Sequence, residues 1–176
     1  ALTFDDVTLV PKYSEILPSD VDTSIKLTEN LKLKIPLFAI AKITVTERKM
    51  AHGIKNSGWI GHSHRKLNIK KQISEIQKVK KKKLLVGAAV GAGPKEFKRA
   101  EAVLKENIDM IVVDTAHGHT KKVSEIVTYI KKKKSKKTAL CAGNIATPEA
   151  AKFLLKLGVD IIKVGIGPGS ICTTRL

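Results

Sequence analysis

The most regular feature of the chain is an alternation of short apolar runs with longer amphipathic stretches. Apolar runs such as LLVGAAV and MIVVD lack the alternating polar positions of a half-exposed strand. Strands that are buried on both faces of a parallel sheet have this pattern. The runs predict strands at residues 35–41, 59–64, 84–90, 110–114, 138–142 and 160–164.

The stretches between these strands have the apolar spacing of helices. In residues 69–82, apolar side chains recur three or four positions apart, at 69, 73, 76 and 79. The sequence TPE at 147–149 supplies a capping threonine, a first-turn proline and an early acid, which together signal a helix start. Helices are predicted at residues 46–57, 69–82, 94–106, 120–134 and 147–157.

This alternation predicts an α/β fold in which helices cover a parallel sheet. A doubly wound sheet and a (β/α)8 barrel both fit the pattern. A doubly wound dinucleotide-binding sheet carries Gly-x-Gly-x-x-Gly after its first strand, but here the glycine-rich turn follows the sixth strand. The pattern alone leaves both architectures open. Residues 1–34, which include Pro11 and Pro18, predict an extended lead-in that packs on the partial barrel of residues 35–176.

Lysine dominates the charge of the chain, which is +17 over 176 residues. The lysines gather in KVKKKK at 78–83 and KKKKSKK at 131–137, and each run closes a predicted helix, where cations suit the helix dipole. Solvated helix ends are therefore one interpretation, and a surface for nucleic acid is the other. Aromatic residues make up only 4% of the chain, so platforms for stacking single-stranded bases are scarce.

The length of the apolar runs and the number of cysteines indicate the cellular compartment in which the protein works. No run approaches the roughly 20 residues of a membrane span, and the N-terminal ALTFDDVTLV lacks the pattern of a secretory signal. Two cysteines do not indicate a disulfide framework, so we expect a reducing, cytoplasmic compartment and no membrane partner. Cys141 falls within a predicted strand and is interpreted as a small core residue. His117 and His119 lack a third ligand at metal-binding spacing.

The strongest chemical signal is the string GIGPGSICTT at residues 165–174. Glycines at alternate positions let backbone N–H groups approach an anion, or let carbonyl groups turn toward a cation. Ser170 can donate to a phosphate. Cys172 follows at the carboxyl end of a predicted strand, where the active sites of β/α barrels lie. A thiolate there can add to an electrophilic ring carbon and form a covalent intermediate.

The wider string KVGIGPGSICTTR resembles the catalytic loop of the inosine-5′-monophosphate (IMP) dehydrogenase and guanosine-5′-monophosphate (GMP) reductase family. Four further strings agree, namely ALTFDDVTLVP, VGAAVG, VVDTAHGHT and AGNIAT. Together they span nearly the whole chain. DTAHGH and the Ile before Cys172 look more like the dehydrogenase branch. The resemblance implies a (β/α)8 TIM barrel, of which about six β/α units are present.

The resemblance also implies roles for individual residues. Cys172 would attack C2 of the purine, Thr174 would lie near the reacting base, and Ser170 would bind the nucleotide phosphate. The backbone carbonyls of Gly167, Gly169 and Cys172 would hold K+. Asp114, Asn144 and Gly165 would line the NAD site, with Asp114 on the nicotinamide ribose. The residues alone equally allow Asp114 to cap a helix and Asn144 to occupy a left-handed loop position.

The activity implied is NAD-dependent oxidation of IMP to xanthosine 5′-monophosphate in guanine nucleotide biosynthesis, by a homotetramer in the cytoplasm. Two alternatives remain. One is the GMP reductase of the same family. The other is a non-catalytic, basic derivative of the barrel that binds nucleic acid through its lysines.

The chain also departs from the family pattern. Ala39, Lys42 and Ile43 stand where the family usually has Ser, Met and Asp, and Trp59 stands where it usually has Gly. The CBS regulatory domain that many members insert after the second helix is not expected, because the lysine run leads directly into Leu84. The sequence ends just after the cysteine loop, so we expect the 176 residues to be inactive alone, or to be a partial reading of a longer chain.

Overall fold

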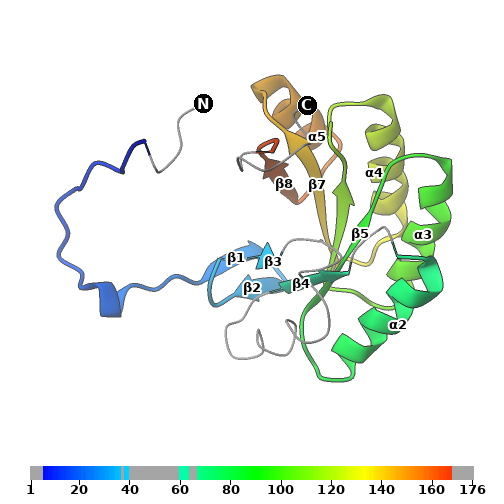
Figure 1. Cartoon of the computed structure of the whole chain (residues 1–176), viewed down its shortest axis with the longest axis horizontal. Helices are drawn as coiled ribbons and strands as arrows, with labels where there is room; N and C mark the ends of the chain where they lie inside the picture. Colours follow the sequence, from blue (N-terminus) through cyan, green and yellow to red (C-terminus); the bar gives the residue numbers. More distant parts are fainter. Residues whose placement is uncertain (1–5, 37, 40–59, 64–66, 168–176) are drawn as a thin grey trace.

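The structure is a computed structural model of the chain, and it describes residues 6–36, 38–39, 60–63 and 67–167 (Figure 1). The predicted helix at 46–57 lies outside these ranges. The strands are β1 (Ile25–Thr28), β2 (Leu31–Leu33), β3 (Phe38–Ala39), β4 (Ile60–Ser63), β5 (Val86–Val90), β6 (Met110–Asp114), β7 (Ala139–Ile145) and β8 (Ile161–Val164). The α-helices are α2 (Ile69–Lys80), α3 (Pro94–Leu104), α4 (Lys121–Lys133) and α5 (Pro148–Lys156), and a short 3₁₀ helix covers Pro18–Asp20.

The order of the strands distinguishes the two architectures that the sequence left open. Strands β3 to β8 form one parallel sheet in which each strand pairs with the next along the chain, in the order β3-β4-β5-β6-β7-β8. A doubly wound sheet reverses its strand order at a switch point, and this sheet does not. Helices α2 to α5 follow one another around one face of the curved sheet (Figure 1). The described residues therefore form an open α/β sheet consistent with part of a TIM barrel, and no closed barrel is shown.

Side chains of the strands alternate between two apolar layers. In β6, Ile111 and Val113 belong to the main core beneath the helices, whereas Met110 and Val112 belong to a second cluster on the other face. Both layers are closed to water, which explains the continuous apolar runs in the sequence. Leu140 repeats the pattern on β7, since it is fully buried under the helices.

The face of the sheet opposite the helices is covered at one end by an antiparallel hairpin of β1 and β2. Leu31 and Leu33 of the hairpin are at most 1% exposed and pack with Met110 and Val112. The hydrophobic pattern did not predict this hairpin, because strands of 4 and 3 residues are too short for their alternation of apolar and polar residues to stand out. Residues 6–22 are exposed and run away from the sheet (Figure 1). Within the described residues of the lead-in, the part that packs on the sheet is the hairpin.

Most predicted boundaries lie within a few residues of the observed ones. Strand β7 runs three residues beyond the predicted end at 142, because Gly143 and Ile145 continue the pairing with β8. Helices α4 and α5 begin after threonine caps, with Thr120 Oγ1 accepting from Val123 N at 3.3 Å and Thr147 Oγ1 accepting from Ala150 N at 3.2 Å. None of the helices in the described ranges is long and apolar enough to cross a membrane.

Two aspartates fix the amino ends of neighbouring strands in the same way. Asp109, just before β6, accepts from Val86 N through Oδ2 at 2.8 Å and donates its own N–H to Val86 O at 2.9 Å. Asp160, just before β8, repeats this on Leu140, with distances of 2.7 and 2.9 Å. Each aspartate therefore binds both backbone groups of one residue on the preceding strand, which fixes the register of β5 with β6 and of β7 with β8.

Candidate functional site

The carboxyl edge of the sheet carries a lysine–aspartate pair that spans three strands. Asp114 ends β6, and its register partner on β7 is Gly143, which in turn is partnered by Lys163 on β8. Lys163 Nζ lies 2.7 Å from Asp114 Oδ1. The two side chains are 38% and 23% exposed, so the pair is half-buried at the edge where barrel enzymes place their chemistry.

Gly143 makes this pairing possible because it has no side chain between the two partners. A Cβ built on Gly143 would lie 2.7 Å from Lys163 Cβ and closer still to the backbone oxygen of Lys163. Cβ atoms essentially never approach other heavy atoms so closely, so a larger residue would push β8 away from β7. The glycine in AGNIAT is therefore required by the close approach of β8.

Asn144 lies at an irregularity of the β7–β8 ladder. Gly143 pairs with Lys163 and Ile145 with Val164, so one extra residue of β7 is accommodated at Asn144. Bulges of this kind re-aim side chains and are common beside active sites. Asn144 Nδ2 donates to Gly165 O at 2.6 Å. The side chain therefore holds the start of the glycine-rich loop that follows β8.

The backbone of Asn144 also anchors the loop that follows β6. Asn144 N donates to Thr115 O at 2.8 Å, and Gly118 N donates to Asn144 O at 2.7 Å. A Cβ on Gly118 would lie 2.9 Å from the same carbonyl oxygen. The glycine of the DTAHGH string is thus placed where its loop packs directly on β7. Asn144 therefore joins two loops at the carboxyl edge, those after β6 and β8.

Cys141 lies beneath this pair on the same face of the sheet. Its side chain is 6% exposed and packs in the cluster of Met110 and Val112. Burial raises the pKa of the Cys141 thiol to about 12, the positive charge of Lys163 lowers it, and the negative charge of Asp114 adds to the rise. The prediction that Cys141 is a core residue is confirmed, and the thiol is protonated at neutral pH.

The structure brings together part of the predicted site. Asp114, Asn144 and Gly165 meet at the carboxyl edge, through Lys163 and the bond from Asn144 to Gly165. Gly165 and Gly167 have φ angles of +105° and +54°, which favour glycine. Gly169, Ser170, Cys172 and Thr174 lie outside the described residues, as do Lys42, Ile43 and Trp59.

The two alternative interpretations of the cofactor residues are wrong. Helix α4, which follows Asp114, is capped by Thr120, while the Asp114 carboxylate pairs with Lys163. Asn144 is within β7 and is absent from the non-glycine residues with positive φ in the described part of the chain. Lys163 was not predicted as a site residue. Its signal is a single charged residue inside the apolar run DIIKV.

The two histidines of DTAHGH lie apart from any group of metal ligands. His119 packs against Phe153, with ring centroids 4.7 Å apart, and His117 is exposed. In the ranges that the structure describes, no group of three or more His, Cys, Asp or Glu residues could hold a metal ion.

Comparison with known proteins gives the family. A family model described as the IMP dehydrogenase / GMP reductase domain matches residues 1–176. The chain belongs to the IMP dehydrogenase / GMP reductase family. Among curated members, the chain is 38% identical to the inosine-5′-monophosphate dehydrogenase of Borreliella burgdorferi, with 100% of the chain and 56% of that protein covered. It is also 38% identical to the protein of that name from Cryptosporidium parvum, covering 99% of the chain and 54% of the relative.

A third family member, the inosine-5′-monophosphate dehydrogenase of Aquifex aeolicus, is 30% identical, with 99% of the chain and 62% of that protein covered. The chain thus spans little more than half the length of the curated relatives it matches. The lysine–aspartate pair and the anchored loops described above lie within the matched region.

The described residues fit a dinucleotide at the carboxyl edge. The hydroxyl groups of a ribose diol donate hydrogen bonds that a fixed carboxylate accepts well. Asp114 supplies such a carboxylate, and its side chain is 23% exposed. Gly165 lacks a side chain, and the space where its Cβ would lie is open, which permits close approach of a ligand. Of the predicted K+ ligands only Gly167 is described, so K+ stays a prediction.

Proposed function

We propose that the protein oxidises IMP to xanthosine 5′-monophosphate with NAD, as a step of guanine nucleotide biosynthesis. The observation that carries the proposal is the Asp114 carboxylate, held by Lys163 across Gly143. It lies at the carboxyl edge of the sheet, where β8 leads into the loop that bears Cys172. The family match over the whole chain supports the same activity.

Asp114 accepts hydrogen bonds from the nicotinamide ribose in this proposal. Lys163 occupies Oδ1, and no described residue donates to Oδ2, so that oxygen is directed to the diol. Asn144 holds Gly165 and joins the loops after β6 and β8, which would border the bound cofactor. NAD supplies the hydride acceptor when it is bound there.

The chemistry at the purine belongs to the loop that follows Gly167. The Cys172 thiolate adds to C2 of IMP, forming a C–S bond, and the hydrogen at C2 departs as hydride. Water then attacks C2, the C–S bond breaks, and the thiol is restored as xanthosine 5′-monophosphate forms. Ser170 holds the phosphate of the nucleotide, and Thr174 lies near the base. We propose that the backbone carbonyls of Gly167, Gly169 and Cys172 bind K+.

The assembly proposed is a homotetramer in the cytoplasm. The alternatives are not favoured, because the three relatives reported above carry the dehydrogenase name. The reductase alternative predicts consumption of NADPH with GMP, and the non-catalytic alternative predicts no turnover with either nucleotide.

Covalent trapping tests the nucleophile. A 6-chloropurine ribonucleotide incubated with the protein is expected to leave an adduct on the tryptic peptide that contains Cys172, detected by mass spectrometry. The Cys172→Ala variant is expected to show no adduct, and Cys141 is expected to stay unmodified in both. An adduct on Cys141 alone, or none on Cys172, would overturn the proposed role of that cysteine.

A further inference from the structure

The opposite, amino edge of the sheet forms a second continuous surface. It consists of the connections from α2 to β5, α3 to β6, α4 to β7 and α5 to β8, defined here as residues 81–85, 105–109, 134–138 and 157–160. In parallel β/α units these connections all lie at one edge. We call this surface the amino edge.

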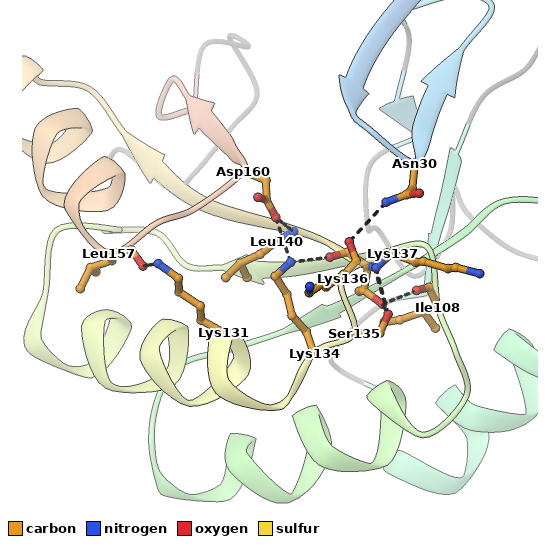
Figure 2. Close-up of polar contacts among 11 residues, drawn as sticks. Asn30, Ile108, Lys131, Lys134, Ser135, Lys136, Lys137, Leu140, Leu157 and Asp160 are labelled. Atoms are coloured by element: carbon orange, nitrogen blue, oxygen red, sulfur yellow. Dashed lines mark hydrogen bonds and ion pairs between the residues drawn. The ribbon is translucent and has the colours of Figure 1, made fainter.

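Hydrogen bonds join neighbouring connections of the amino edge. Lys80 Nζ donates to Asn107 O, and Thr138 Oγ1 donates to Ile108 O at 2.9 Å. Figure 2 shows Lys131 directed to Leu157 O at 3.1 Å. The connections and the last turns of α2 and α4 are therefore linked through polar contacts.

The hairpin borders this surface as well. Asn30, at the turn between β1 and β2, donates through Nδ2 to Lys136 O at 3.4 Å (Figure 2). Lys32 and Lys34 of the hairpin are exposed, and they add charge to the rim of the amino edge.

Exposed lysines outnumber available acids on the amino edge. Those that the argument uses are Lys81, Lys82, Lys83, Lys136 and Lys137, all exposed. None of them forms an ion pair with a described residue. Lysines that lie close together without acidic partners create a positive potential that attracts polyanions.

The aspartates of this edge are directed into the fold. Asp109 Oδ2 is bound to Val86 N, and Asp160 Oδ2 is bound to Leu140 N and lies 3.3 Å from Lys134 Nζ (Figure 2). Glu106 accepts from Gln77 Nε2 at 3.1 Å. The two aspartates thus order the strands and Glu106 binds α2, while the lysines face water.

We propose that the amino edge binds the phosphate backbone of double-stranded nucleic acid. The four connections contain no aromatic residue on which single-stranded bases could stack. They also contain none of the exposed large apolar residues that would anchor a membrane surface. Lysines on the first and third connections provide phosphate contacts without base readout, so binding is sequence-independent and strongly dependent on salt.

Two variants of equal charge test the location. The edge variant is K81Q/K82Q/K136Q/K137Q. The control variant is K70Q/K71Q/K121Q/K122Q, which removes four exposed lysines from the first turns of α2 and α4, at the carboxyl edge. Both variants lower the net charge equally. Thermal unfolding checks that each is folded, and fluorescence anisotropy with a labelled 20-base-pair duplex at 50–200 mM salt measures affinity.

The intact protein is expected to bind the duplex with a dissociation constant on the order of 1–100 μM near physiological salt, the range of non-specific binding. The edge variant is expected to bind at least about tenfold more weakly, and its plot of log affinity against log salt to be shallower by about 3, since each phosphate contact adds about 0.9 to the slope. The control variant is expected to stay within about twofold.

Three results would overturn the proposal. One is the absence of duplex binding by the intact protein at 50 mM salt. Another is an equal loss of affinity in the two variants, which would assign binding to net charge. The third is tighter binding to single strands, polyglutamate or anionic phosphatidylserine vesicles than to the duplex. Because the amino edge lies at the other end of the strands from Asp114, the edge variant is expected to bind NAD as the intact protein does.

Discussion

Lys163 reaches across Gly143 to place its ammonium nitrogen 2.7 Å from Asp114 Oδ1. The pair joins β6 to β8 over a position on β7 that has no side chain. A charged pair at 38% and 23% exposure adds at most about 1 kcal/mol to stability. Its importance therefore lies in fixing the direction of the carboxylate.

Gly143→Ala is expected to destabilise the protein by about 1–3 kcal/mol, as overpacking does at close backbone contacts. The clash involves the backbone oxygen of Lys163 as well as its Cβ. Shortening the lysine should therefore not rescue the variant. Urea unfolding of Gly143→Ala, with and without Lys163→Ala, measures this, and full recovery of stability in the double variant would show that the clash is with the side chain alone.

Asp160→Ala is expected to cost about 1–3 kcal/mol, because the buried N–H of Leu140 loses its acceptor at the amino end of the strand. Asp109→Ala should have a similar effect through Val86. The corresponding asparagine variants should lose less, since an amide oxygen can still accept. The control is Glu29→Ala, which removes an exposed ion pair with Lys26 and should change the unfolding free energy by less than about 0.5 kcal/mol.

Because the pKa of the buried Cys141 thiol is raised, we expect the protein to lose stability in alkali. Its folded-state pKa is about 12 against an ordinary value of 9.0, so the folded protein retains a proton that the unfolded chain releases between these values. Stability is unaffected by this group below pH 9 and falls above it, by up to about 1.4 kcal/mol per pH unit. The measurement is urea unfolding at pH 8 to 10.5 of the protein and of Cys141→Ala.

The difference between these two proteins isolates the contribution of the thiol to the pH dependence of stability. The wild type should lose stability faster than Cys141→Ala as the pH rises. Parallel curves would contradict the burial of this thiol.

The sequence predicted the sheet and its helices well because their physical signals are local. A strand such as Met110–Asp114 is buried on both faces, so its apolar run is continuous, and a helix such as Lys121–Lys133 has an apolar stripe and a threonine cap. The hairpin was missed because Leu31 and Leu33 are buried by contact with the distant sheet. Their own strand is too short to carry a recognisable hydrophobic pattern.

The candidate site was predicted in part, and for a different reason. Asp114, Asn144 and Gly165 were predicted from the family resemblance of short strings. Lys163 could not be paired with Asp114 from the sequence, because the pairing depends on the register of three strands and on the missing side chain of Gly143. Interactions across a sheet carry no signal in the spacing of residues along the chain.

The central claim is that the Asp114–Lys163 pair belongs to the cofactor site. Steady-state kinetics of NADH formation tests it most directly, in a protein of the relatives' full length that contains these residues. Asp114→Asn and Lys163→Met are expected to raise the KM for NAD by roughly tenfold or more, the effect of losing one hydrogen bond to a charged group, while the KM for IMP changes by less than about twofold. Lys163→Arg should recover part of the loss. Lys134→Met, in the lysine–aspartate pair with Asp160 at the amino edge, is the matched control and should leave both constants unchanged. A rise in the KM for IMP with an unchanged KM for NAD would contradict the assignment.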